Sequence, residues 1–237
     1  MTALLRAERI RLRTVPAPLF AVTAVLALSG AVIGIGFGTA PADAAQDLGQ
    51  LVRVPGVLVG LTMLLLGVLG GSSDFQHRTA EPTYLIRPRR LEVFAARQAT
   101  YAALGAVAGA LTGTLAWLLA RTVGSARDLP AGLPGDALGL VAAYVLAAML
   151  AAVLGVSVGY AARSTVIGVI GVVVWSAVGE NLLGLVVPKT YLPFGALSSV
   201  VGLGEGGSAL HGGIALAVYA AMAAVVAGRL VLPRDIT

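Results

Sequence analysis

The chain has 237 residues, of which 58% are hydrophobic and only 11% are charged. Soluble domains carry roughly 25% charged residues, so this chain cannot cover itself with a solvated surface, and we expect an integral membrane protein without a soluble domain. Cysteine is absent, which excludes disulfides and thiolate metal sites. The net charge is +5; in a membrane chain, a basic excess more often encodes topology than nucleic-acid binding.

The chain begins with a basic, amphipathic stretch over residues 1–16. Its arginines share one face at helical spacing: Arg6, Arg9 and Arg13. We expect an interfacial helix that contacts membrane lipid on the inner leaflet before the first span. Two other interpretations stay open, an ordinary basic flank and a cleaved signal peptide. The apolar run 18–39 is longer than the about 7–15 residues of a signal peptide's apolar core, which disfavours cleavage.

Six apolar segments follow, each near the ~20 residues that a helix needs to cross a membrane. We therefore predict an all-α integral membrane protein with one transmembrane domain. The predicted spans are 18–39, 54–72, 97–120, 137–160, 165–187 and 211–232. Pro55 falls in the first turn of the second span, and Asp136 and Ser164 are expected as N-caps. No alternation with a period of two recurs, which disfavours a β-barrel.

The distribution of basic residues gives the orientation. With the N-terminus in the cytoplasm, 12 of the 16 Lys and Arg residues lie inside and 4 outside, in agreement with the positive-inside rule. The outer four are Arg53, Arg121, Arg127 and Lys189. We expect both termini and the connection 73–96 to be cytoplasmic. We expect residues 188–210 to lie outside as loop and short interfacial helices.

Small residues recur at four-residue spacing in three of the spans. Such ridges let helix backbones approach closely inside a membrane, where no hydrophobic effect drives association. We interpret them as packing seams, within or between subunits. They are Gly30, Gly34 and Gly38; Gly105, Gly109 and Gly113; and Ala147, Ala151, Gly155 and Gly159.

Glu180 and Asn181 stand toward the outer end of the fifth span. An ionisable residue inside a membrane is costly and by default suggests function, here a transport or ion site. The alternative is structural, with a helix break at the outer interface and Glu180 as a capping or snorkelling side chain. The sequence leaves both interpretations open.

Several sequence patterns that could indicate nucleotide or metal binding lack the neighbouring residues or structure that such a site requires. Residues 202–207 fit GxGxxG, but a dinucleotide site requires a strand before the glycines and a helix after them. No Walker A sequence exists, because the one lysine, Lys189, follows a proline. His77 and His211 are predicted on opposite sides of the membrane and, without cysteine, cannot share a metal site. We expect no enzymatic activity, metal or cofactor in this chain, and no nucleic-acid partner.

Charged residues gather between the second and third spans. Nine ionisable or His side chains lie within positions 74–97 of an otherwise apolar chain. A charge-rich connection between two spans is where a membrane protein of this kind meets a soluble partner.

This connection resembles the permease subunits of type-2 ABC transporters, the ABC-2 family. The family shows an acidic–aromatic–x–His–Gly–Thr run, then a short apolar stretch that ends in Pro-Arg-Arg. Here residues 74–79 (DFQHRT) and 85–90 (LIRPRR) are similar to that pattern. Arg78 replaces the usual Gly, and Asp74 replaces the commoner Glu.

Two further stretches are similar to the same family. One is the basic, Glu-containing start at 6–14, and the other is Glu180 followed by Tyr191, Leu192 and Pro193 near the end of the fifth span. The resemblance covers the whole six-span plan, and it implies a type V exporter-like transmembrane domain.

The resemblance implies a transmembrane subunit without its own ATPase domain. It would pair with a second copy or a homologous permease, and with two ATP-binding subunits that carry ATP and Mg²⁺. In this family the segment between spans two and three holds a coupling helix that docks on the ATPase. By motif match, that role falls on Asp74, Phe75, His77, Arg78, Thr79, Arg87, Arg89 and Arg90. The Ala- and Arg-rich composition suggests a bacterium, and hence its inner (plasma) membrane.

The spans contain almost no charge, so the path between subunits is expected to be apolar. Its larger side chains would be Trp117, Tyr144, Tyr160 and Trp175. This favours export of a hydrophobic or amphiphilic compound, such as a drug, antibiotic, lipid-like molecule or peptide. Two other classes stay open. An ion-coupled secondary transporter or channel would use Glu180 and predicts broken helices in both halves; a non-transporting scaffold would recruit partners through 73–96.

Overall fold

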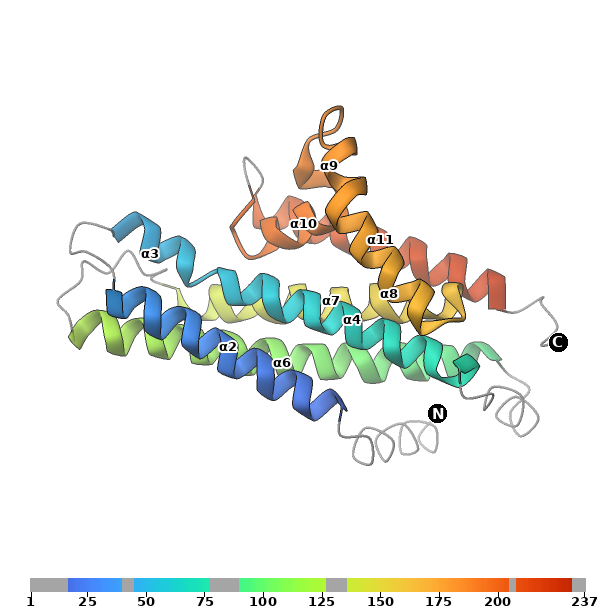
Figure 1. The fold of residues 1–237 in the computed structure, drawn as a ribbon, viewed down its shortest axis with the longest axis horizontal. Coiled ribbons are helices and arrows are strands. Elements are labelled where there is room, and N and C mark those ends of the chain that lie inside the picture. Colours follow the sequence, from blue (N-terminus) through green and yellow to red (C-terminus); the bar gives the residue numbers. More distant parts are fainter. Residues whose placement is uncertain (1–16, 40–44, 77–89, 127–135, 205–207, 232–237) are drawn as a thin grey trace.

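The computed structural model describes residues 17–39, 45–76, 90–126, 136–204 and 208–231 (Figure 1). Within these ranges the chain is helical apart from short turns, with no strand. A π-helical turn, Trp175–Gly179, joins α8 to α9, and a 3-10 turn, Lys189–Tyr191, precedes α10. The α-helices are α2 (Ala17–Thr39), α3 (Ala45–Leu51), α4 (Val54–Gln76), α6 (Arg90–Ala126), α7 (Ala137–Ala162), α8 (Thr165–Val174), α9 (Glu180–Leu183), α10 (Pro193–Val200) and α11 (Ala209–Val231).

Six helical segments are long and apolar enough to cross a membrane. Each coincides with one of the predicted spans, which confirms the prediction of an all-helical, multi-pass membrane protein. The segments are Pro18–Thr39, Leu48–Gln76, Arg90–Ala126, Ala137–Ala162, Thr165–Leu183 and Ala209–Arg229.

Three spans have ends that differ from the prediction by four or more residues. The second span, predicted to end at 72, continues to Gln76. The third span, predicted at 97–120, belongs to a helix of 37 residues, Arg90–Ala126, which at 1.5 Å per residue is longer than the ~30 Å hydrocarbon layer. Hydropathy alone assigned the polar first turns of this helix to the connection 73–96. The fifth span, predicted to reach 187, ends its helix at Leu183, because the apolar residues that follow lie in a turn before Pro188.

Both predicted N-caps are confirmed. The Asp136 carboxylate accepts a hydrogen bond from Leu138 N at 3.1 Å at the start of α7, and Ser164 Oγ accepts one from Ile167 N at 3.4 Å at the start of α8. Between these two helices, Arg163 adopts a left-handed conformation with φ 51° and closes α7 through its N–H to Gly159 O. The connection from α7 to α8 is therefore very short.

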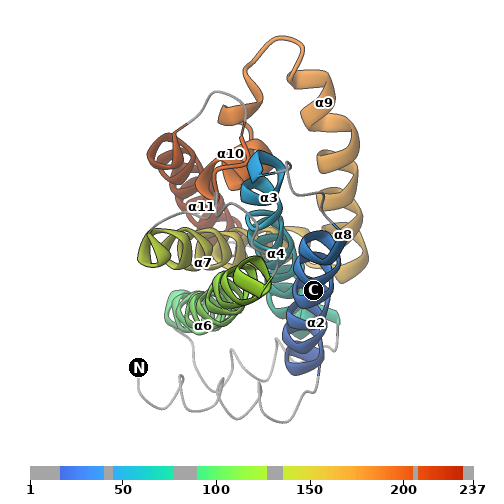
Figure 2. The ribbon, with the colours of Figure 1, turned by 90° about the vertical axis from the view of Figure 1, so that its left-hand side faces the viewer.

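Helix α7 packs against α4, α6 and α11 (Figure 2). Two of the predicted glycine ridges form these contacts. A Cβ on Gly109 of α6 would lie 2.5 Å from Tyr144 O of α7, and a Cβ on Gly155 of α7 would collide with Leu64 O of α4. Both ridges therefore serve contacts within this chain. By contrast, a Cβ on Gly34 of α2 would meet nothing within 4 Å.

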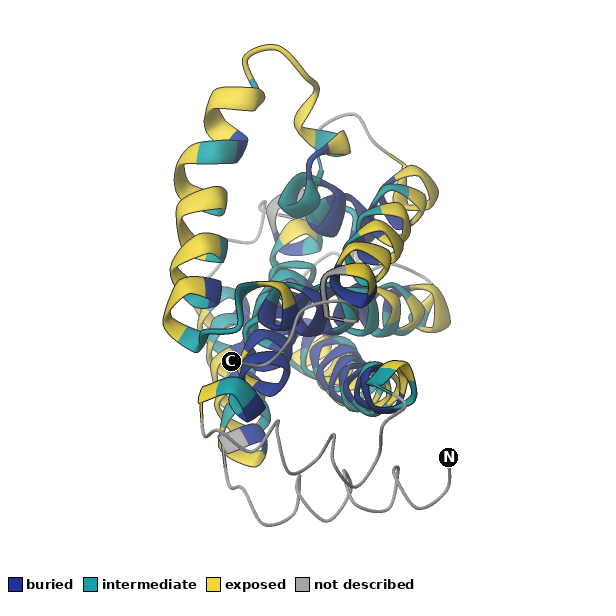
Figure 3. Ribbon diagram, turned by 90° about the vertical axis from the view of Figure 1, so that its right-hand side faces the viewer, coloured by how far each residue is buried: buried dark blue, intermediate teal, exposed yellow. Residues whose placement is uncertain are grey.

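Helices α8 and α9 form an arm that leans away from the bundle (Figures 1 and 2). Helix α8 packs mainly against α4 and α7, and most of the arm's outer side is exposed (Figure 3). The exposed side chains are apolar, such as Ile167, Ile170 and Val174. Apolar side chains exposed on a membrane-spanning helix face lipid or another helix without an energetic penalty.

The described part of the segment 188–210 is partly helical, as predicted, and contains helix α10. Helix α10 packs against α11, α7 and α4, and its residues Ala196, Leu197 and Val200 are buried. Burial of its apolar side against three spans explains this position. Helix α10 thus becomes part of the core of the bundle.

Candidate functional site

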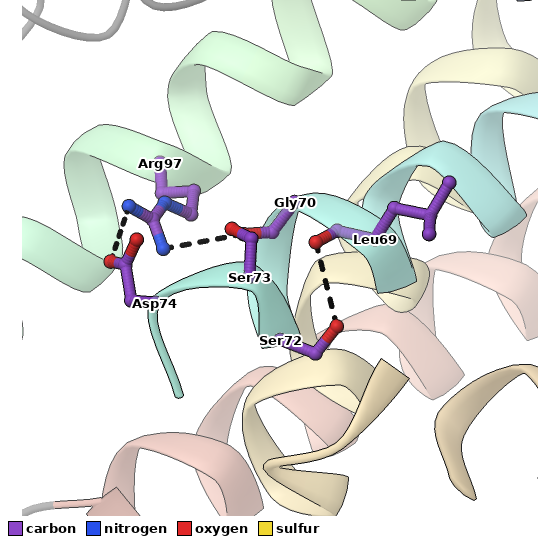
Figure 4. A network of polar contacts seen from close by, with 6 residues as sticks. All are labelled: Leu69, Gly70, Ser72, Ser73, Asp74 and Arg97. Carbon is purple, nitrogen blue, oxygen red and sulfur yellow. Dashed lines mark hydrogen bonds and ion pairs between the residues drawn. The ribbon is translucent and has the colours of Figure 1, made fainter. Parts of the chain in front are cut away.

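The last turn of α4 is joined to α6 by a buried ion pair (Figure 4). Arg97 Nη2 lies 2.7 Å from Asp74 Oδ2, and the two side chains are only 2% and 9% exposed. Arg97 Nη1 also donates a hydrogen bond to Gly70 O at 3.2 Å. Breaking a buried pair is strongly destabilising because it leaves an uncompensated charge, so Asp74 and Arg97 hold α4 and α6 together next to the connection 77–89.

An aromatic cluster surrounds this ion pair and adds α7 to it. The Tyr160 ring of α7 makes edge-on contacts with Phe75 and Phe94, at centroid distances of 5.8 and 4.8 Å. The Arg97 guanidinium stands 5.6 Å from the centre of the same ring, an attractive cation–π geometry. Three helices therefore meet at one tyrosine.

Helix α8 is attached to the same turn of α4. Thr165 Oγ1, in the first turn of α8, lies 2.7 Å from Ser72 Oγ and donates to Gln76 Oε1 at 2.6 Å. Arg163 stands over the Phe75 ring at 5.6 Å. We call these residues and the ion pair the α4-end cluster: Ser72, Asp74, Phe75, Gln76, Phe94, Arg97, Tyr160, Arg163 and Thr165.

Some of the predicted coupling residues belong to this cluster, and others lie in the connection 77–89, outside the described residues. Asp74 and Phe75 belong to the cluster, where they contact Arg97 of α6 and Tyr160 of α7. Arg90 is the first residue of α6 and is partly buried. The others lie outside the described residues: His77, Arg78, Thr79, Arg87 and Arg89.

The contact between Arg97 and Asp74 was not predicted. Arg97 stood at the first position of the predicted span 97–120, and only the structure places it seven residues inside helix α6, where an arginine needs an acidic or carbonyl partner. Asp74 is the acidic residue at the end of the preceding span, and α6 brings it within reach.

Glu180 forms the second polar site of the described chain. Its side chain is buried, with 7% of the residue exposed. Its carboxylate accepts hydrogen bonds from Phe194 N at 2.5 Å and from Gly195 N at 3.3 Å, the amides of the first turn of α10. A carboxylate at a helix N-terminus satisfies donors that have no partner within the helix. In this structure Glu180 therefore caps α10.

The π-helical turn Trp175–Gly179 directly precedes Glu180. Such turns are frequent at functional sites. This one determines the side of the helix on which Glu180 lies. Its neighbour Asn181 is exposed and donates to Ala177 O of its own helix at 2.8 Å. The Asn181 Oδ1 atom lies 3.5 Å from Lys189 Nζ, whereas Glu180 accepts the amides of α10.

The other end of α10 is also held by a charged side chain. Arg53 Nη1 donates to Gly202 O at 3.0 Å, directly after α10, and Gly202 has a φ of 80° that favours glycine. Beside it, the Tyr144 hydroxyl donates to Val52 O. Helix α10 is therefore fixed at both ends, by Glu180 and by Arg53.

The four aromatic residues expected along an apolar path occupy different surroundings. Tyr144 and Tyr160 are fully buried between helices of this chain, so they do not line a surface between subunits, contrary to the expectation. Trp117 lies beneath the Arg121 guanidinium at 5.3 Å. Trp175 is 41% exposed on the arm.

The rejected motifs have plain structural explanations in the described chain. Gly202 and Gly204 follow a helix and not a strand, which excludes the dinucleotide fingerprint. His211 Nδ1 lies 2.6 Å from Ser208 Oγ at the start of α11. Within the described ranges, no three His, Asp or Glu side chains gather as metal ligands.

No family model, curated protein or solved structure matches the chain.

Proposed function

We propose that the chain is the permease subunit of an ATP-driven transporter of the ABC-2 type, in a bacterial plasma membrane. It would export a hydrophobic or amphiphilic compound. ATP and Mg²⁺ would bind to two separate ATP-binding subunits, since this chain has no Walker A sequence. A second copy or a homologous permease would complete the complex.

The α4-end cluster is the observation that carries this proposal. The connection 77–89 holds the family-like motif, and the helices on both sides of it are joined by the Asp74–Arg97 ion pair. The same turn is bonded to α8 through Thr165. A force applied to 77–89 by a moving ATPase would therefore reach three helices as one rigid unit, which is what rigid-body coupling requires.

The two alternatives make different predictions. Inverted repeats of an ion-coupled transporter predict a broken helix in each half, whereas among the described spans only the fifth contains a π-helical turn. Glu180 is also bonded to two backbone amides, which accounts for its burial without an ion. A scaffold would bind a partner without substrate flux.

The decisive experiment is co-purification in mild detergent from the native membrane, followed by an ATPase assay. We expect an ABC ATPase at about equal stoichiometry with vanadate-sensitive turnover. A chain that purifies alone and shows no turnover would contradict the transporter proposal.

The coupling segment is tested by Arg89→Glu with Arg90→Glu. We expect this pair of substitutions to abolish substrate-stimulated ATPase activity while the chain still inserts, because it reverses charges of the proposed docking segment. The matched control is Arg229→Glu with Arg234→Glu, which makes the same charge change at the inner end of the last span and just after it. Equal stimulation in the parent and the Arg89/Arg90 variant would refute the coupling role.

A further inference from the structure

A polar pocket of about 510 Å³ opens at the junction of α9 and α10. This volume lies within the ~300–1,000 Å³ of small-molecule sites. The pocket contains one buried carboxylate and the only lysine of the chain. Its polar side chains are Glu180, Lys189, Thr190 and Ser198.

Both charged groups have hydrogen-bonding capacity left for a ligand. Each carboxylate oxygen of Glu180 accepts one backbone amide, and the Trp175 side chain also hydrogen-bonds to this carboxylate. Since a carboxylate offers about four acceptor positions, one position remains. Lys189 is exposed, and its Nζ lies 3.5 Å from Asn181 Oδ1, which engages one of its three donors. The pocket therefore presents one anionic and one cationic group.

A second, apolar pocket of about 230 Å³ is lined in part by Pro193 and Phe194 in the first turn of α10. It is lined by aliphatic, aromatic, proline and glycine residues from α4, α7, α8 and α10. Those that matter here are Leu64, Leu154, Val158, Trp175, Pro193 and Phe194.

Residues of the first turn of α10 line both pockets. Phe194 lines the apolar pocket and its neighbour Gly195 lines the polar one, while the amides of both residues bond to Glu180. The π-helical turn places Trp175 in the apolar pocket and Glu180 in the polar pocket, five positions apart. A polar and an apolar compartment thus adjoin at one capped helix end.

We infer that this junction binds an amphiphile with a zwitterionic head group. Its ammonium group would face Glu180, its phosphate or carboxylate would face Lys189, and part of its apolar chain would lie against Trp175 and Phe194. Such an amphiphile would be a substrate of the transporter proposed above. That it is transported rests on the proposed function; that it binds does not. A bilayer phospholipid and a transported compound share this chemistry.

Binding is measured on the purified full chain in nanodiscs of phosphatidylglycerol. The chain has two tryptophans, so Trp117→Phe leaves Trp175 as the fluorescence reporter. Three short-chain probes are compared: dihexanoylphosphatidylethanolamine as the zwitterion, dihexanoylphosphatidylglycerol as the anion, and dodecyltrimethylammonium as the cation. We expect a saturable change in Trp175 emission, with the zwitterion binding roughly tenfold tighter than either other probe, since each charge-assisted contact contributes to affinity.

Two substitutions locate the site. Lys189→Glu and Glu180→Gln should each weaken zwitterion binding roughly tenfold, because each removes one charge partner. Lys189 is exposed, so its substitution leaves the fold intact. The matched control, Arg121→Glu, reverses an exposed cation elsewhere and should leave binding unchanged. Equal affinity for all three probes, or parent-like affinity in Lys189→Glu, would overturn the inference.

A second set of nanodiscs identifies the source of the head group. If phosphatidylethanolamine in the bilayer displaces the short-chain probe, the occupant is a membrane lipid. If the probe binds equally well in its presence, the occupant is a free amphiphile with the same head group. The binding assay contains no ATPase, so its result is independent of the co-purification experiment. If the zwitterion binds but no ATPase co-purifies, the transporter proposal alone is refuted. If an ATPase co-purifies but the zwitterion does not bind, the binding site alone is refuted.

Discussion

The buried charges of Asp74 and Arg97 offset each other. We expect Asp74→Ala to destabilise the folded chain by about 3–5 kcal/mol, since it removes this carboxylate from the buried Arg97 guanidinium. The check is the thermal unfolding midpoint of the purified protein in detergent. Replacing both residues with leucine should recover most of the loss. A double variant as unstable as Asp74→Ala would show that the pair does more than neutralise itself.

Glu180 allows a similar comparison at the start of α10. We expect Glu180→Ala to destabilise the chain by roughly 1–2 kcal/mol, because it removes the acceptor of two backbone amides at a helix end. Asn181→Ala is the control: Asn181 is exposed, donates to Ala177 O of its own helix and accepts one long bond, of 3.5 Å, from the exposed Lys189. Thermal unfolding measures both. Similar midpoints for the two variants would mean that the cap contributes little.

The helices α4 and α7 approach so closely that the glycines between them have no room for a side chain. Gly155→Leu would force a side chain against Leu64 O, and we expect a loss of about 1–3 kcal/mol or more from overpacking. Gly34→Leu makes the same change where a Cβ meets nothing within 4 Å, and should be tolerated. The yield of monodisperse protein and its unfolding midpoint check this, and equal losses would contradict the assignment of the seam.

Elements that depend on local chemistry were predictable from the sequence. The six spans follow from hydropathy, and Asp136 and Ser164 cap the helices that they immediately precede. Interactions between distant residues were not predictable. Glu180 caps amides 14 and 15 residues further on, and only the π-helical turn and the burial of α10 bring them together.

The Asp74–Arg97 pair shows the same limit. Their contact depends on the relative register of α4 and α6, which no local pattern specifies. The segment 73–96 is predicted as one charged cytoplasmic connection, although both of its ends are helical and its Asp74 pairs with Arg97, just beyond it. The candidate coupling residues within 77–89 rest on the sequence motif alone.

At the scale of the whole molecule, the charge distribution predicts both termini inside. We expect a C-terminal green fluorescent protein fusion to fluoresce, and alkaline phosphatase inserted at 127–135 to be active, because the first reporter works in the cytoplasm and the second outside it. Phosphatase inserted at 77–89 should be inactive. The opposite pattern would reverse the orientation and would place the candidate coupling segment beyond the reach of any cytoplasmic ATPase.

The packing of α7 against both α4 and α6 also has a consequence for assembly during synthesis. Helices α4 and α6 are synthesised and inserted before α7 exists, so the backbone grooves at Gly67 and Gly109 first face lipid and close only when the fourth span arrives. Membrane helices associate after insertion through such close contacts. A ribosome stalled before Asp136 would therefore leave a half-bundle with open grooves, a substrate for membrane proteases and not a smaller stable protein.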